Sequence, residues 1–139
     1  MMKELRQRKV GIISCSGEEC VEGTISRVAT RLVLGKLRPN ETVTICLPLF
    51  LAGGREERGF AQVYPTITVD GCDKLCAKVA TERYSAKPAS SIVVTDLTKN
   101  WQCPKLNSRR KLTDETLAVA RKVADRVAQE VDEVLEHWV

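Results

Sequence analysis

Short hydrophobic runs and longer amphipathic stretches alternate along the chain, and this pattern predicts four strands with helices between them. The runs rich in Val, Ile and Thr, which are typical of buried strands, are residues 10–14, 42–46, 66–69 and 91–96. Thr24 is expected to cap a helix with one apolar stripe, formed by Ile25, Val28, Ala29, Leu32 and Val33. Further helices are expected at 55–62 and 73–84, and an apolar loop at 47–54.

The last stretch of the chain carries the clearest helical periodicity. Apolar side chains recur there in alternating three- and four-residue steps: Leu117, Ala120, Ala124, Val127, Val131, Val134 and Trp138. This seam is expected to cover the protein's own sheet, and the alternative is that it pairs with a second subunit in a homodimer.

Alternation of strands and helices predicts an α/β fold. Right-handed crossovers with one reversal of direction give a mostly parallel sheet of about four strands, in an order such as 2-1-3-4, between two helical layers. We expect a single domain of 139 residues. Its parts are a core at 10–97, a polar connection at 98–112 and a long C-terminal helix at 113–138.

Composition narrows the classes of function. Apolar residues make up 43% and charged residues 29% of the chain, as in ordinary globular domains, and the formal net charge is +4. Aromatic residues, at 4%, are too few for a base-stacking platform, so nucleic acid is not an expected partner. The longest apolar run, 45–52, is too short to cross a bilayer, and the charged residues 1–9 do not resemble a signal peptide. A cytoplasmic location without membrane attachment is therefore expected.

Three of the six cysteines lie at the end of a predicted strand or just past it. Cys15 follows the first strand, Cys46 ends the second, and Cys72 follows the turn after the third. The carboxyl ends of parallel strands meet at one edge of a sheet, where such sheets bind ligands. Cys76 comes four residues after Cys72, so a helix that begins between them would stack the two sulfurs on one face.

Four thiolates gathered at one edge would satisfy the tetrahedral shell of a zinc ion. The predicted ligands are Cys15, Cys46, Cys72 and Cys76, with Cys20 and Asp70 as auxiliary residues. Asp70 is also expected to accept hydrogen bonds from the amides of its own turn. The same cysteines could instead hold an iron–sulfur cluster or carry out thiol–disulfide exchange, through Cys15 with Cys20 or Cys72 with Cys76. The sequence leaves open whether catalysis takes place at this site.

Other reaction classes find little support in the sequence. A Cys-x5-Arg phosphatase loop would need Arg where Val21 stands, and no glycine-rich phosphate loop is present. Glu18 and Glu19 are expected to be solvated loop charges, and His137 is expected on the surface. Residues 49–51 are expected either in the core or as an apolar flap that keeps water from the cysteines.

These residues resemble the DGC domain family, which is named for a central Asp-Gly-Cys motif. The resemblance spans about residues 10–97, and its motifs are Cys15-Ser16-Gly17, Cys46, and Asp70-Gly71-Cys72 followed by Cys76. The family is described as a zinc-binding domain with four chelating cysteines, and its biochemical role is uncharacterised. The resemblance implies Cys15, Cys46, Cys72 and Cys76 as ligands, whereas Cys20 and Cys103 match no motif of the family.

Three classes of function follow from these patterns. The first is a zinc-binding protein with a structural, metal-handling or sensing role. The second is a thiol redox or iron–sulfur electron-transfer protein that uses the same cysteines. The third is an adaptor that docks an unknown protein partner through the C-terminal helix and the basic cluster Arg109-Arg110-Lys111.

Overall fold

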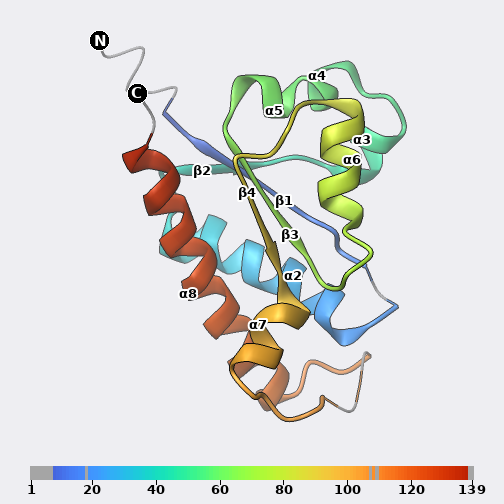
Figure 1. Ribbon diagram of the computed structural model, residues 1–139, viewed down its shortest axis with the longest axis vertical. Helices are drawn as coiled ribbons and strands as arrows, with labels where there is room; N and C mark the ends of the chain where they lie inside the picture. Colours follow the sequence, from blue (N-terminus) through green and yellow to red (C-terminus); the bar gives the residue numbers. More distant parts are fainter. Residues whose placement is uncertain (1–7, 18, 107, 109, 138–139) are drawn as a thin grey trace.

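The computed structural model describes residues 8–17, 19–106, 108 and 110–137. Within these residues the chain forms a four-stranded parallel sheet in the order β2-β1-β3-β4 (Figure 1). The strands are β1 (Val10–Ser14), β2 (Thr42–Thr44), β3 (Thr66–Asp70) and β4 (Ser90–Val93). The α/β fold and the predicted strand order 2-1-3-4 are thus confirmed.

The register of the sheet brings the carboxyl ends of its strands to a common edge. Ser14 at the end of β1 lies opposite Val69 of β3. On the other side of β1, Ile12 lies opposite Thr44, the last residue of β2, and Thr44 Oγ1 donates a hydrogen bond of 2.6 Å to the carbonyl of Ile12. The loops that follow these three strands therefore leave the sheet at the same edge.

Helices cover both faces of the sheet (Figure 1). One face carries α2 (Val21–Leu32), the π-helical turn η1 (Val33–Leu37) and α8 (Asp114–Glu136); the other carries α3 (Leu47–Leu51), α4 (Arg55–Arg58), α5 (Phe60–Val63) and α6 (Cys76–Tyr84); and α7 (Val94–Asn100) follows β4 directly. Successive residues of β1 point to opposite faces and so serve two cores. Ile12 belongs to the core under α2 and α8, whereas Ile13 packs with Phe60 and Ala77.

Some of the predicted boundaries are wrong. Segment 47–54 contains α3 rather than only a loop, because Pro48 fits the first turn of a helix, where a backbone N–H has no partner within the helix. The predicted helix 55–62 is split into α4 and α5 at Gly59. The fourth strand ends at Val93, and α7 begins at once and runs into the predicted connection.

The apolar seam of the C-terminal helix faces the interior of the domain. Ala120, Ala124, Val127 and Val131 are fully buried, Leu117 and Val134 are partly buried, and Trp138 lies outside the described residues. α8 packs against α2 and also contacts β1 and β4. Thr113 caps the helix, since its Oγ1 accepts a hydrogen bond of 3.1 Å from the N–H of Thr116. The seam is thus used within the domain, and the oligomeric state stays a prediction.

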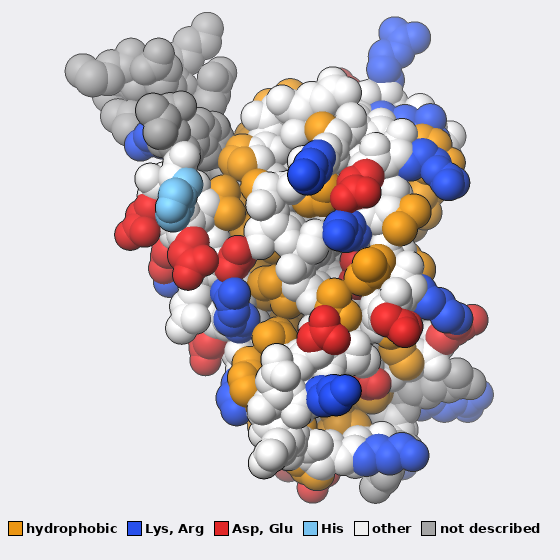
Figure 2. Space-filling view, viewed as in Figure 1, with side chains coloured by type: hydrophobic (Ala, Val, Ile, Leu, Met, Phe, Trp, Pro, Cys, Tyr) orange, Lys and Arg blue, Asp and Glu red, His pale blue; other side chains and the backbone are white. Residues whose placement is uncertain are grey.

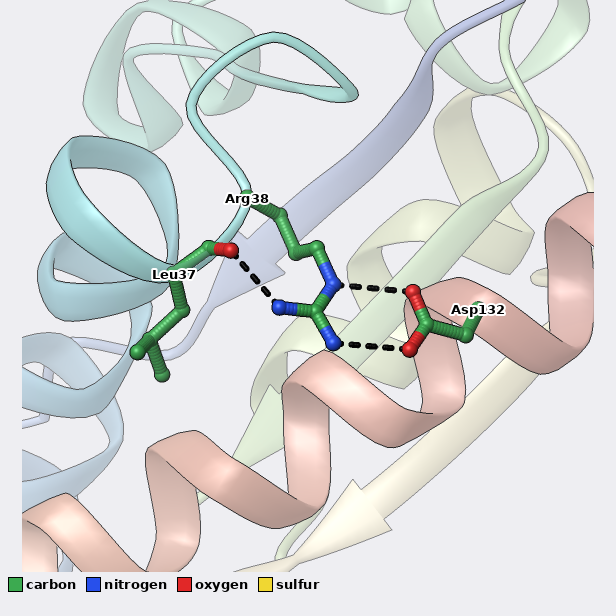
Figure 3. A network of polar contacts seen from close by, with 3 residues as sticks. All are labelled: Leu37, Arg38 and Asp132. Atoms are coloured by element: carbon green, nitrogen blue, oxygen red, sulfur yellow. Dashed lines mark hydrogen bonds and ion pairs between the residues drawn. The ribbon is translucent and has the colours of Figure 1, made fainter.

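A bidentate ion pair holds α8 to the turn after η1 (Figure 3). The guanidinium of Arg38 donates to both carboxylate oxygens of Asp132, at 2.8 and 2.7 Å, and to the carbonyl of Leu37 at 2.7 Å. The hydrogen bonds from Arg38 lower the pKa of Asp132. Because the Asp132 side chain is 50% exposed, solvent and salt screen this pair.

We expect Asp132→Asn to lower the free energy of unfolding by about 0.5–1 kcal/mol at neutral pH, the usual range for an exposed pair. A carboxyl with a lowered folded pKa contributes stability above its unfolded pKa of about 3.9 and loses it as the pH falls through the folded value. Urea unfolding of both proteins should therefore show a difference that shrinks as the pH falls from about 3.9 through the lowered pKa of Asp132. A difference that grew in acid would contradict this account.

The surface mixes charges of both signs with hydrophobic side chains, and basic and acidic groups lie near one another over the face seen in Figure 2. Leu49, Leu51 and Val79 are nearly half exposed, on α3 and α6. None of the helices in the described part of the chain combines the length and the apolar character that a membrane crossing requires.

Candidate metal centre

Cys15 is held at the carboxyl edge of the sheet by three segments of the chain. Its backbone N–H donates to the carbonyl of Val69 at 3.0 Å, which extends the pairing of β1 with β3 past the end of β1. Its Sγ accepts a hydrogen bond of 3.3 Å from the N–H of Gly71 and lies 3.4 Å from the Oγ of Ser26 in α2. The sulfur therefore joins the loop after β1 to the loop after β3 and to α2.

The hydroxyl of Ser26 is a hydrogen-bond partner of the Cys15 sulfur. Ser26 Oγ donates its proton to the carbonyl of Gly23 at 2.6 Å, so it is free to accept one from the Cys15 thiol. When Cys15 is deprotonated, the N–H of Gly71 still donates to the sulfur, and Ser26 can turn its proton towards it. Gly71 and Ser26 can thus form hydrogen bonds with the Cys15 sulfur whether it is a thiol or a thiolate.

Three glycines bring the loops of this edge into direct backbone contact. A Cβ on Gly71 would lie 2.5 Å from the nitrogen and 2.6 Å from the Cα of Gly23, in the first turn of α2. A Cβ on Gly23 would in turn overlap the carbonyl group of Gly17. The first turn of α2 is therefore clamped between the loop after β1 and the loop after β3.

This clamp holds the first turn of α2, which Cys20 precedes, against Gly71, the residue before Cys72. Cys20 has an extended backbone and precedes the first residue of α2, Val21, so the helix begins earlier than the expected cap at Thr24. Burial raises the pKa of the Cys20 thiol, and negative charge on Glu22, Cys72 and Cys15 raises it further.

Cys76 belongs to the same group of thiols. Burial raises the pKa of its thiol, and negative charges on Asp70, Cys15 and Cys72 act in the same direction. We refer to Cys15, Cys20, Cys72 and Cys76 as the thiol cluster. An exposed ion pair of 3.6 Å, between Lys74 and Glu19, also links the two loops that carry these cysteines.

The prediction that Cys72 and Cys76 stack on one helical face is wrong. α6 begins only at Cys76, and Leu75 before it has a left-handed backbone with φ of 55°. The cause is Asp70, whose carboxylate accepts hydrogen bonds from the amides of Ala77 at 2.7 Å and Lys78 at 3.1 Å. The intervening loop has to turn back so that the N-terminus of α6 reaches this carboxylate.

Asp70 is thus a buried cap rather than an exposed candidate ligand. Its side chain is 1% exposed, and each carboxylate oxygen accepts an amide hydrogen from α6 instead of from its own turn. Burial raises the pKa of Asp70, although the two amides and the charge of Lys78 oppose the shift. Its role is to hold α6, and with it Cys76, at the edge of the sheet.

The remaining sequence candidates lie apart from these contacts. Cys46 is exposed and precedes α3, after the edge strand β2. Cys103 packs against the core under α2 and α8. His137 is exposed, with its Nδ1 2.7 Å from the carbonyl of Glu133. In segment 49–51 only Phe50 is buried, and its ring meets that of Tyr84 at 6.2 Å between centroids.

The donor chemistry of the thiol cluster fits zinc, since its cysteines are free thiols at one edge and thiolate is a preferred zinc ligand. Their side chains do not yet converge: across residues 8–17, 19–106, 108 and 110–137, no three Cys, His, Asp or Glu side chains are spaced to hold an ion. Ion binding would require these side chains to turn towards a common centre.

Sequence reasoning missed Ser26 and Gly23, which determine the surroundings of Cys15. Gly23 lies within the first turn of α2, and a glycine inside a helix is a signal for close backbone approach. No local pattern marks Ser26, because its partner Cys15 is positioned by the sheet.

A family model described as the DGC domain matches residues 11–119, which is most of the chain and includes all six cysteines. No curated protein and no solved structure matches the chain.

Proposed function

Because this chain belongs to the DGC domain family, we propose that it is a zinc-binding protein that holds the ion through cysteines at the carboxyl edge of its sheet. The observation that carries this proposal is the direct contact between the loops after β1 and β3: Gly71, the residue before Cys72, donates its N–H to Cys15 Sγ at 3.3 Å and lies against Gly23 in the turn that follows Cys20. All six cysteines are free thiols, which leaves them available as ligands.

Turning the side chains towards a common centre costs little free energy compared with what zinc binding contributes. An off-rotamer side chain costs about 0.5–1.5 kcal/mol, whereas structural zinc binding in peptides contributes about 10–16 kcal/mol near pH 7. The cysteines lie on loops or next to the first residue of a helix, so they can turn without moving the strands. The ion can therefore close the cluster at small cost.

The chain's own groups would stabilise the thiolates. The N–H of Gly71 donates to Cys15 Sγ, and Ser26 Oγ lies beside the same sulfur. Burial raises the pKa of Cys20 and of Cys76, and their position at the N-termini of α2 and α6, where the helix dipole favours negative charge, opposes this effect. Lys74 adds a positive charge on the loop between Cys72 and Cys76. A zinc ion with four thiolates cross-links these loops, which suits a structural, metal-handling or sensing role.

Elemental analysis of untagged, freshly purified protein tests the proposal. We expect about one zinc ion per chain, and Cys72→Ser to reduce that content strongly, because it removes one of four ligands. Cys103→Ser is the matched control and should keep the zinc, since Cys103 packs against the core rather than in the thiol cluster. Wild-type protein that holds no zinc after zinc addition and dialysis would contradict the proposal. Brown protein containing iron would indicate a cluster instead.

Thiol redox chemistry is the second candidate, and it is favoured by the position of Cys15 and Cys20, both free thiols, five residues apart in the segment between β1 and α2. In that reaction the two thiols would reduce a low-molecular-weight disulfide to its two thiols and become a Cys15–Cys20 disulfide themselves. Metal-free protein in which this disulfide forms and is reduced reversibly, as read by mass spectrometry, would support the second candidate over the first.

A further inference from the structure

The backbone around Cys20 is already fixed against the loop that carries Cys72. Gly23 meets Gly17 on one side and Gly71 on the other, with contacts so close that no Cβ fits. The N–H of Gly23 donates to the carbonyl of Cys20 at 3.1 Å, which ties Cys20 to this clamp. The backbone of Cys20 is thus held next to the loop that carries Cys72 before any ion binds.

Cys46 occupies a different position. It follows β2, and β1 lies between β2 and β3, so the two outer strands are about 10 Å apart at a strand spacing of about 4.8 Å. Its carbonyl accepts the N–H of Phe50 at 3.0 Å in the turn of α3, and Phe50 is fully buried. Moving Cys46 towards β3 would therefore disturb α3 and the packing of Phe50.

We propose that Cys20, rather than Cys46, completes the zinc site together with Cys15, Cys72 and Cys76. This inference rests on the proposed function, and it changes the ligand set that the family resemblance implies. The exposed pair between Glu19 and Lys74, 3.6 Å apart, joins the loop that ends at Cys20 to the loop between Cys72 and Cys76. Two linked loops would then supply all four ligands, and β2 would supply none.

Cobalt(II) titration of the full chain tests the ligand set, since the intensity of the thiolate-to-cobalt absorption follows the number of bound sulfurs. We expect Cys20→Ser to reduce this intensity by about a quarter, one thiolate of four, and to weaken zinc binding at least about tenfold in competition with a chromophoric chelator. Cys46→Ser is the matched control and should match the wild type in both measurements. Loss of intensity or affinity in Cys46→Ser, or wild-type behaviour of Cys20→Ser, would overturn the inference.

Alkylation of the wild-type protein provides a second measurement that does not depend on how the variants fold. Zinc should protect Cys20 from iodoacetamide, whereas the exposed Cys46 should react at the same rate with and without zinc. Protection of Cys46 instead of Cys20, located by peptide mass spectrometry, would overturn the inference while leaving zinc binding itself intact. Failure of the wild-type chain to bind either metal would instead refute the proposed function.

Discussion

Replacing Gly71 with alanine is expected to destabilise the domain by about 3 kcal/mol, at the upper end of the usual cost of overpacking. The added Cβ would lie 2.5 Å from the nitrogen of Gly23, 2.6 Å from its Cα and 2.7 Å from the carbonyl carbon of Glu22. All three atoms belong to the backbone of α2, so no side-chain rotation relieves the overlap. The loop after β3 and the first turn of α2 would have to move apart.

Gly35→Ala is the matched control, because a Cβ at Gly35 meets no heavy atom within 4 Å. Gly35 lies in the π-helical turn η1, where alanine should be neutral or stabilising by up to about 1 kcal/mol. Urea unfolding should therefore lower the midpoint of Gly71→Ala strongly and leave that of Gly35→Ala near or above the wild type. Equal midpoints for the two variants would show that the glycine contact carries no such constraint.

The sheet could be predicted because its signals are local and its topology obeys general rules. The β-branched run of β3 and the apolar run of β1 identify buried strands without knowledge of their partners. The strand order then follows from the handedness of crossovers and one reversal of direction. The ends of the strands fixed where Cys15 and Cys72 emerge, and the structure places both at the same edge.

The start of α6 could not be predicted, because the group that caps it lies outside the helix and its loop. Asp70 ends β3, and its carboxylate reaches Ala77 and Lys78 across a turn with a left-handed Leu75. A local pattern of residues favours a helix from position 73, since it contains no glycine or proline to stop it. The tertiary hydrogen bonds determine the boundary, and with it the separation of Cys72 from Cys76.

The surroundings of the cysteines depend on contacts between distant segments in the same way. Cys20 looks like a loop residue in the sequence, and the turn that follows it is held against the loop of Cys72 by the contact of Gly23 with Gly71. Cys46 looks equivalent to Cys15, because both follow strands, yet it precedes a short helix and is exposed. Spacing identified the thiols as candidates, whereas backbone contacts between distant segments determine how the loops that carry them are held.

Asp70→Ala is expected to lower the free energy of unfolding by about 2–3 kcal/mol, because a hydrogen bond to a charged group contributes about 1.5–3 kcal/mol and two amides lose their acceptor. The buried carboxylate itself carries a desolvation cost, which keeps the net loss below the sum of both bonds. Asp70→Asn keeps one acceptor oxygen and should cost less than Asp70→Ala. Urea unfolding at neutral pH measures both, and an alanine variant as stable as the wild type would contradict the capping role.

The pH dependence of the Asp70→Asn effect distinguishes burial from hydrogen bonding as the larger influence on this carboxyl. Burial raises the pKa of Asp70, so the folded protein binds a proton there more readily than the unfolded chain does. Stability from this group therefore decreases as the pH rises from about 3.9 through the raised value, whereas asparagine does not titrate. Glu130 and Asp132, whose pKa values are lowered, act equally in both proteins and cancel in the comparison.

The free energy of unfolding of the wild type should exceed that of Asp70→Asn by more near pH 4 than near pH 7. A smaller margin in acid would mean that the two amides of α6, rather than burial, dominate the ionisation of Asp70.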